Sequence, residues 1–238
     1  MSSAVTIGEC HLPLRDKVVA ELRRRIIDCD YPPGDRLTED RLADDFGVSR
    51  NPVREAIRVL EREGFLVGLP RRGAVVATVS RQDIENVFEV RLVLEVLAAQ
   101  LAAKHIDAAG AATLRQLVTD AASAATATEL AALNSAFHGE ICRLCGNTLL
   151  MNIMDSLHDR LQWIYRQTAV HRAPMSLTEH TALAEAITVG DSKAAGRAAH
   201  AHVVAARETA LRHSVHSVAA TSTESHGRPA VCITVLDV

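Results

Sequence analysis

The sequence predicts a mostly α-helical protein of two domains, an N-terminal helix-turn-helix with a small β-hairpin followed by an all-α helical bundle. Two observations carry this prediction. Within residues 38–64, two short apolar runs at helical spacing are separated by Gly47, and glycine readily takes the left-handed conformation that ends a helix. From Ser80 almost to His213, apolar residues keep helical spacing with no intervening strand pattern, which is typical of a helical bundle.

The composition is that of an ordinary globular protein. With 238 residues, of which 48% are hydrophobic, the chain is long enough for two domains with cores of their own. No apolar run is long enough to cross a membrane and no signal peptide opens the chain, so we expect a cytoplasmic protein without membrane contact. The five cysteines are an odd, irregularly spaced set, which argues against a secreted disulfide framework.

The segment before the helix-turn-helix predicts an arm and one helix. Residues 1–12 show no periodicity, and we expect them to form a mobile arm. From Leu14 to Ile27, apolar residues recur at the spacing of an amphipathic helix. The Tyr-Pro-Pro-Gly run that begins at Tyr31 then breaks this helix.

The second helix of the helix-turn-helix carries a cationic edge. Ser49 is a suitable N-cap for this helix, and arginines follow every four residues at Arg50, Arg54, Arg58 and Arg62. Residues 49–73 hold six arginines against three glutamates, a local net charge of +3 (6 − 3). This arrangement is typical of a DNA-reading helix-turn-helix, in which Arg50 and Arg54, one turn apart, enter one groove and contact guanine edges. The alternative is a helical hairpin with a solvated charged face.

The next segment predicts a β-hairpin. Residues 65–67 and 74–79 have the pattern of two strands, and Pro70 and Gly73 supply the turn between them. The tip of this hairpin carries two arginines, Arg71 and Arg72. A hairpin of this kind directly after a recognition helix is a wing, which places arginine in the narrow, negative minor groove.

Residues 13–79 resemble the winged-helix DNA-binding domain of GntR-family bacterial regulators. The matching motifs are Pro33-Gly34, Leu42-Ala43, the segment from Gly47 to Arg50, the segment from Pro52 to Ile57, Leu60, Glu63-Gly64 and Arg72-Gly73. The resemblance implies that four residues of the second helix face double-stranded DNA: Ser49, Arg50, Asn51 and Arg54. It also implies that the wing glycine, Gly73, approaches the DNA backbone closely.

Two positions of the DNA-reading domain depart from the family pattern. Asn51 stands where threonine is common, so base preference is expected to differ there. Asp40 stands where some members carry a DNA-contacting arginine, so that contact is expected to be absent. Arg36 or Arg41 then supplies part of the missing phosphate binding.

Residues 80–213 predict a bundle of six helices and mark the second domain. Ser80 is a cap-like start to the first helix, and the fifth and sixth helices are expected over Leu177–Val189 and Ser192–His213. The tail, residues 214–238, is polar and then apolar. We expect it to be disordered or to form a stray strand against the bundle.

Three histidines of the bundle lie beside apolar positions and therefore face its interior. Asn134 and His138 are four residues apart on one helical face, and His180 and His202 belong to two later helices. Neutral imidazole is a good ligand for divalent transition metals, and three protein histidines leave coordination positions open. The alternative is three unrelated histidines, each hydrogen-bonded separately in a helical core.

Residues 80–213 resemble the all-helical ligand-binding domain of the FadR branch of GntR regulators, the FCD domain. The matching motifs are Glu89-Val-Arg91, Leu94-Glu95, Asn134 with Phe137-His138, Gly146-Asn147, Glu179-His180, Gly190-Asp191 and His202. The resemblance implies a metal held by Asn134, His138, His180 and His202, with zinc the first choice and nickel, cobalt, iron or manganese as alternatives. Asparagine replaces the more common aspartate, and its neutral oxygen is the weaker ligand.

The resemblance also implies that the metal holds structure or helps to bind a small carboxylate effector. Arg91 is expected to face the bundle, where its guanidinium can clamp that carboxylate with two hydrogen bonds. The alternative is a salt bridge from Arg91 to Glu89 or Glu95. A separate alternative metal or redox cluster consists of Cys142 and Cys145 on the His138 face, although a buried cysteine usually acts as a small hydrophobe.

Together these features predict a dimeric, ligand-responsive transcription factor, most simply a repressor, and not an enzyme. A two-fold homodimer reads a two-fold site, so the expected partner is a palindromic operator with one half-site per subunit. Two other functions remain open from the sequence. One is a metal-free regulator that senses fatty acyl-CoA, and the other is a metal-dependent enzyme built on the three histidines.

Overall fold

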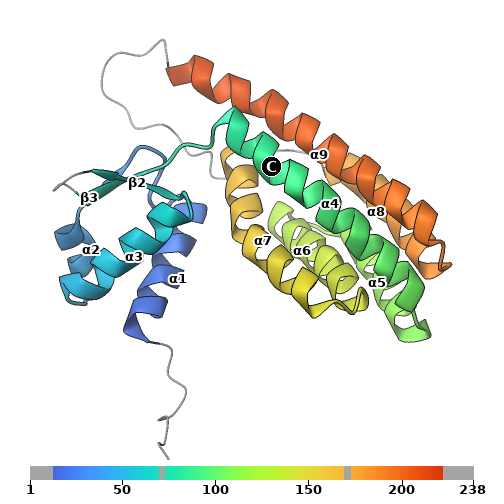
Figure 1. The fold of residues 1–238 in the computed structure, drawn as a ribbon. Helices are drawn as coiled ribbons and strands as arrows, with labels where there is room; N and C mark the ends of the chain where they lie inside the picture. Colours follow the sequence, from blue (N-terminus) through green and yellow to red (C-terminus); the bar gives the residue numbers. More distant parts are fainter. Residues whose placement is uncertain (1–12, 70–72, 169–172, 222–238) are drawn as a thin grey trace, which may run out of the picture. The chain divides into compact units, whose positions relative to one another are not determined.

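The computed structural model describes residues 13–69, 73–168 and 173–221 and divides the chain between Thr78 and Val79 into two compact units. Figure 1 shows both units, and each is described by itself below. The mostly α-helical fold with one small sheet confirms the predicted fold class. No helix of the described ranges is long and apolar enough to span a membrane. The predicted arm, the wing arginines Arg71 and Arg72, and the tail from residue 222 onward lie outside these ranges.

The described part of the first unit packs helices against a three-stranded antiparallel sheet. Its elements in chain order are α1 (Leu14–Ile27), β1 (Arg36–Leu37), α2 (Glu39–Phe46), α3 (Arg50–Arg62), β2 (Leu66–Leu69) and β3 (Gly73–Val76). The strand order is β1-β3-β2. Side chains with no exposed area, including Leu22, Leu42, Val53 and Leu60, form the core between the three helices, so the apolar stripes of the sequence face one another.

Local signals set the two helices of the helix-turn-helix. The Thr38 hydroxyl accepts a hydrogen bond from the backbone N–H of Arg41 and caps α2. Gly47 ends α2 with a φ of 63°, the left-handed conformation that glycine adopts without strain. Ser49 occupies the N-cap position of α3 in extended backbone, but its side chain makes no cap hydrogen bond. The predicted side-chain cap is therefore wrong, although the predicted helix start is right.

The predicted hairpin forms, although its strands have other bounds than the predicted 65–67 and 74–79, and a third strand joins it. Residues 66–69 and 73–76 form β2 and β3, and β1 pairs with β3 through Arg36 and Val75. Gly73 has a φ of 85°, and a Cβ atom built on it would lie 2.1 Å from the carbonyl oxygen of Leu37. The close approach of β1 therefore requires glycine at this position, independently of any approach to DNA.

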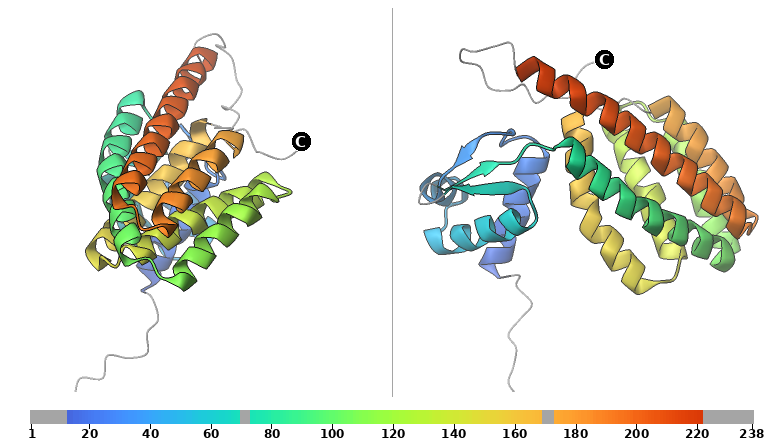
Figure 2. Two further views of the ribbon diagram at one scale, coloured as in Figure 1. Left: turned by 90° about the vertical axis from the view of Figure 1, so that its right-hand side faces the viewer. Right: turned by 45° about the horizontal axis from the view of Figure 1, so that its top comes forward.

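The described part of the second unit is entirely helical. Its elements are α4 (Arg81–His105), α5 (Ala108–Ala122), α6 (Ala127–Leu144), α7 (Thr148–Thr168), α8 (Ala173–Thr188) and α9 (Ser192–Thr221). The two longest helices, α4 and α9, lie side by side in Figures 1 and 2. Buried alanines on both helices, such as Ala99 and Ala199, allow this close packing, because small contact residues shorten the distance between helix axes.

Two helix bounds in this unit differ from the prediction. Helix α8 begins at Ala173 rather than Leu177, because Pro174 falls in the first turn, where a missing N–H costs no helical hydrogen bond. Helix α9 continues to Thr221, past the predicted end near His213. At the start of the unit, Ser80 is the N-cap that the sequence predicted, and it forms a reciprocal capping box with Asp83.

Candidate DNA-reading surface and metal centre

The cationic edge of α3 lies on the exposed side of the helix. The side chains of Arg50 and Arg54 are 67% and 47% exposed, whereas Val53 and Ile57 on the opposite face are buried. Both arginines belong to the first two turns of α3. The structure thus presents them together on one surface, as the sequence predicted for residues that enter one groove.

Both arginines contact carboxylates at the start of α2. The Arg54 guanidinium donates from Nε and Nη2 to the two carboxylate oxygens of Glu39, at 2.8 and 2.7 Å. Arg50 Nε lies 2.6 Å from Asp40 Oδ1. The hydrogen bond from Arg54 is the main cause that lowers the pKa of Glu39 below its ordinary value. No sequence spacing within one helix could reveal these pairs, because they join α2 to α3.

Other residues predicted to face DNA are exposed as well. Ser49 and Asn51 are exposed beside Arg50 at the start of α3, and Arg36 is exposed in β1. Arg41, the alternative phosphate ligand, forms an ion pair with Asp35 at 3.2 Å. The exposed residues of α3 and β1 are therefore accessible to a partner.

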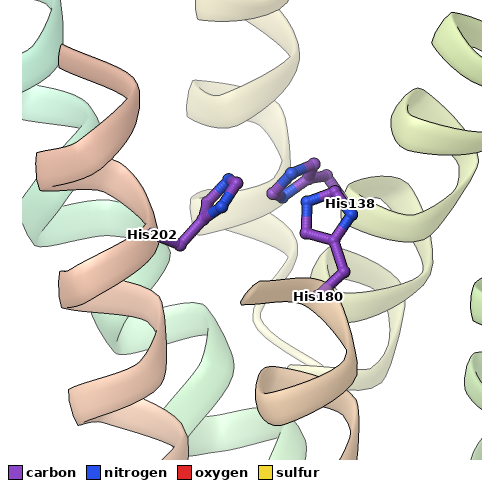
Figure 3. A group of neighbouring side chains, drawn as sticks. All are labelled: His138, His180 and His202. Atoms are coloured by element: carbon purple, nitrogen blue, oxygen red, sulfur yellow. The ribbon is translucent and has the colours of Figure 1, made fainter. Parts of the chain in front are cut away.

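Three histidines from three helices meet inside the second unit. His138 on α6, His180 on α8 and His202 on α9 point toward one another (Figure 3). One ligand-capable atom from each lies within 4.8 Å of the others, and the ring centroids are 4.8 to 5.1 Å apart. His180 and His202 are 4% and 3% exposed. This grouping has the ligand types and the spacing of a divalent metal site.

A carboxylate lies beside the Nδ1 atom of two of these imidazoles, and one of the two contacts is a hydrogen bond. His202 Nδ1 lies 2.8 Å from Glu179 Oε2, and His138 Nδ1 lies 3.7 Å from Glu95 Oε2. We assign the proton to Nδ1 in both rings, as in carboxylate–histidine–metal arrangements. The Nε2 lone pair of His138 is then available, whereas Nε2 of His202 faces Arg91 Nη2 at 3.4 Å. Among the described residues, His138 Nε2 is buried without a hydrogen-bond partner. A buried polar atom of this kind costs free energy unless a ligand satisfies it, so the residues fit a bound metal.

Arg91 is buried beside the histidines and is already paired. Its Nε donates to Glu95 Oε1 at 2.5 Å, it also donates to the Tyr165 hydroxyl, and its Nη2 lies 3.4 Å from His202 Nε2. Burial lowers the pKa of Arg91, but the charges of Glu95 and Tyr165 and the hydrogen bonds to them together more than offset that effect, so the pKa is raised overall. The predicted alternative of a salt bridge to Glu95 is therefore present in this structure. Glu89, the other alternative partner, is exposed.

Asn134 lies one helical turn before His138 on α6. It is half-buried and lines a small pocket with Phe137 and His180. A second small pocket is lined by Glu95, His138 and hydrophobic neighbours. Each pocket has an internal free volume of about 10 Å³, which is the space of about one water molecule.

The cysteine alternative receives little support. Within the described ranges, the group of close metal-ligating side chains consists of histidines and contains neither Cys142 nor Cys145. Burial raises the pKa of the Cys142 thiol to about 12, so this thiol is protonated at neutral pH and is a poor ligand and nucleophile. Cys145 is fully buried and packs in the hydrophobic core of the bundle.

The sequence does not indicate the roles of three polar residues around the histidines. Its patterns offer Glu95 as a partner for Arg91 and place Glu95 and Glu179 in family motifs, but they do not join either carboxylate to a histidine or Tyr165 to Arg91. The four-residue spacing from Arg91 to Glu95 is a usable signal. Glu179 instead serves His202 on another helix, which adjacency in the sequence cannot show.

The site opposes protonation in the folded protein. Burial lowers the pKa of His138 to about 3, although the charge of Glu95 acts in the opposite direction. Burial raises the pKa of Glu95, but Arg91, followed by His138 and His202, more than offsets this and lowers that pKa to about 2. Both groups therefore bind protons more readily in the unfolded chain, where their pKa values are about 6.5 and 4.5.

We expect the metal-free protein to lose stability in acid. The contribution of His138 is fully present above pH 6.5 and decreases as the pH falls toward 3, at about 1.4 kcal/mol per pH unit for one proton. The contribution of Glu95 decreases in the same direction below pH 4.5. Urea unfolding followed by circular dichroism in EDTA, from pH 8 to pH 5, measures this slope. His138→Gln should flatten it and the exposed His200→Gln should not; equal slopes in all three proteins would contradict the assignment.

Comparison with known proteins identifies both units. The family model for bacterial regulatory proteins of the gntR family matches residues 14–76, and the FCD domain model matches residues 86–205. The uncharacterized HTH-type transcriptional regulator YdhC of Bacillus subtilis is 30% identical over 188 residues, which cover 76% of this chain and 84% of that protein. The HTH-type transcriptional repressor RspR of Escherichia coli is 27% identical over 196 residues, 80% of this chain and 86% of that protein.

A solved structure supports the same assignment at the level of the fold. E. coli McbR/YncC superposes with a TM-score of 0.69 at 20% sequence identity, over 85% of this chain and 99% of that chain. The matched families are transcriptional regulators, which excludes the enzyme alternative. The chain therefore belongs to the GntR family of bacterial transcriptional regulators and combines their DNA-binding helix-turn-helix domain with an FCD domain.

Proposed function

We propose that this regulator is a homodimeric repressor of the FadR branch. In this proposal its FCD domain holds one divalent transition metal, and a small carboxylate bound beside the metal changes affinity for a palindromic operator. The observation that carries the proposal is the meeting of His138, His180 and His202 with one buried imidazole nitrogen left unsatisfied. Repression is supported by the repressor RspR among the relatives.

The metal part rests on the chemistry of the donor atoms. Three neutral imidazoles suit zinc first, and also nickel, cobalt, iron or manganese. The low pKa of His138 keeps its lone pair unprotonated at neutral pH, which favours metal binding without competition from protons. Asn134 is the candidate for a fourth, weaker oxygen ligand from the same face of α6 as His138. When bound, the metal would supply an electrophilic centre for a carboxylate.

The effector part rests on Arg91. Its guanidinium lies beside His202, and its contacts with Glu95 and Tyr165 hold it there. A ligand carboxylate that accepts from this guanidinium must displace one of these contacts, since the neighbouring pockets hold about one water molecule each. Binding then requires local opening of the bundle. An effector that binds the opened form more tightly shifts the protein away from its DNA-bound form by linkage.

The site is unsuited to the acyl-CoA alternative. A fatty acyl chain requires a long apolar cavity, whereas the interior around the histidines contains the charged side chains of Arg91, Glu95 and Glu179. These groups are paired with one another, and an acyl chain inserted among them would have to break those pairs in apolar surroundings. A small, anionic ligand matches them better.

We expect at least one small carboxylate to stabilise the zinc-loaded protein. A panel of mono-, di- and tricarboxylates screened by thermal unfolding should contain a ligand that raises Tm by about 5–10 °C at one hundred times its Kd. Arg91→Lys keeps the charge but loses the planar fork, so it should weaken that ligand at least tenfold, by about 1.4 kcal/mol. The same ligand should release wild-type protein from a duplex selected from a random library.

The matched control is Arg143→Lys. Arg143 is exposed on α6 and forms an ion pair with Glu140 at 2.7 Å. This variant therefore also replaces a planar guanidinium by an ammonium group, but outside the site. If Arg91→Lys binds the carboxylate as tightly as Arg143→Lys does, the effector role of Arg91 is wrong. If no member of the panel changes Tm or DNA affinity, the carboxylate class is wrong.

A further inference from the structure

We propose that Glu39 and Asp40, the first two residues of α2, set the selectivity of the recognition helix by holding its two arginines in different ways. Glu39 positions Arg54 for base contact, and Asp40 competes with DNA for Arg50. The proposal rests on the proposed DNA-reading role of Arg50 and Arg54. It assigns a function to two acidic residues on a surface that otherwise would be expected to attract phosphate.

Glu39 holds Arg54 through both carboxylate oxygens. The contact uses the Nε and Nη2 edge of the guanidinium and leaves the edge with Nη1 for a partner. Ordering a free arginine side chain costs up to about 2 kcal/mol of conformational entropy, and a side chain already held in one geometry avoids most of that cost. Glu39 is itself anchored in the first turn of α2, where the helix dipole favours a carboxylate.

Asp40 holds Arg50 through one contact between two exposed side chains. Arg50 Nε lies 2.6 Å from Asp40 Oδ1, and the two side chains are 67% and 60% exposed. Exposed ion pairs are worth between 0 and about 1 kcal/mol, so a strong partner can break this one. A guanine edge that accepts two hydrogen bonds is such a partner, and it stands opposite Arg50 only on the matching sequence.

This difference makes Asp40 a determinant of specificity. On random DNA, Arg50 remains paired with Asp40, so this cation is withheld from the phosphates and contributes little. On the correct sequence, Arg50 exchanges Asp40 for a guanine. The acidic residue thus weakens non-specific binding more than specific binding, which is selectivity obtained by penalising the wrong partner.

The test compares two 30-base-pair duplexes by fluorescence anisotropy, one selected by the wild-type protein from a random library and one of random sequence. Asp40→Asn should bind the random duplex about tenfold more tightly and the selected duplex at most about threefold more tightly, with a salt slope on random DNA steeper by about one. Glu39→Gln should weaken the selected duplex about tenfold, because Arg54 loses its fixed geometry, without weakening the random duplex. Asp44→Asn, which removes an exposed carboxylate one turn further along α2, should change neither.

A double variant separates this mechanism from a general charge effect. In an Arg50→Ala background, Asp40→Asn should lose its preference for random DNA, because Arg50 is no longer there to be released. An equal gain on both duplexes, with or without Arg50, would overturn the role of Asp40. Unchanged binding by Glu39→Gln would overturn the role of Glu39. If Arg50→Ala and Arg54→Ala themselves bind the selected duplex normally, the DNA-reading assignment fails instead, so the two failures are distinguishable.

Discussion

Arg54→Ala and Arg50→Ala are each expected to abolish sequence-specific DNA binding while leaving the protein folded. A bidentate arginine–guanine contact is worth about 1–3 kcal/mol of discrimination, and loss of the positive charge weakens phosphate attraction as well. Both side chains are exposed, and the core of the domain does not depend on them. Gel shifts with the selected duplex measure the loss, and circular dichroism with size-exclusion chromatography checks the fold and the dimer.

Arg58→Ala is the matched control for this prediction. Arg58 lies on the same edge of α3, one turn beyond Arg54, and is also exposed. We expect it to meet phosphates, so its removal should weaken selected and random duplexes alike and lower the salt slope by about one. If gel shifts of Arg50→Ala and Arg54→Ala match the wild type, α3 is not the recognition helix.

The elements of the DNA-binding domain could be predicted because their signals are local. The apolar periodicity of α2 and α3 and the turn at Gly47 lie within a few residues of one another. Strand β1 could not be predicted in this way. It has two residues, and its pairing of Arg36 with Val75 joins segments far apart in the chain, so only the folded domain creates it.

The difference between local signals and contacts across elements also explains why the partners of Arg50 and Arg54 could not be predicted from the sequence. The sequence predicts that Arg50 and Arg54 share a face because both belong to one helix. Their partners, Glu39 and Asp40, belong to another helix, and the contact depends on how α2 crosses α3. Periodicity describes one helix at a time and carries no information on that crossing.

The histidine group shows a more favourable case. Each histidine beside apolar residues is expected to face the bundle interior. The interior of a small bundle is narrow, so three inward histidines are expected to lie close together. Their meeting follows from local patterns together with the family resemblance. Their orientation does not, because it depends on Glu179 and Glu95, which reach the rings across helix boundaries.

The protein purified without a histidine tag is expected to contain about one transition metal per chain, and His138→Ala or His180→Ala should lose it. Each substitution removes one of three donors from a site whose affinity depends on all of them. Free metal at one thousand times its Kd stabilises the folded state by about 4 kcal/mol, so EDTA should lower Tm by about 10 °C. Elemental analysis and thermal unfolding measure both effects.

His200→Ala is the control, because His200 lies two residues before His202 on the exposed side of α9 and should keep its metal. His138→Gln is a second variant, which separates loss of the metal from unfolding because glutamine keeps a similar volume in the core. A wild-type protein that contains no metal, with a Tm unchanged by EDTA and by added zinc, would contradict the site. The three histidines would then be separate core residues.

A substitution of Asn134 tests whether its side-chain oxygen is a fourth ligand of the metal besides the three histidines. Asn134→Asp introduces the aspartate that is expected to be more common at this position in the family. The two side chains have nearly the same volume. If the Asn134 oxygen coordinates the metal, zinc affinity in competition with a chelator should rise at least tenfold, because a charged oxygen binds a divalent cation more strongly than a neutral one. If Asn134 only lines the pocket beside His180, affinity should stay the same, and the metal would be held by three histidines with its remaining positions open to a ligand.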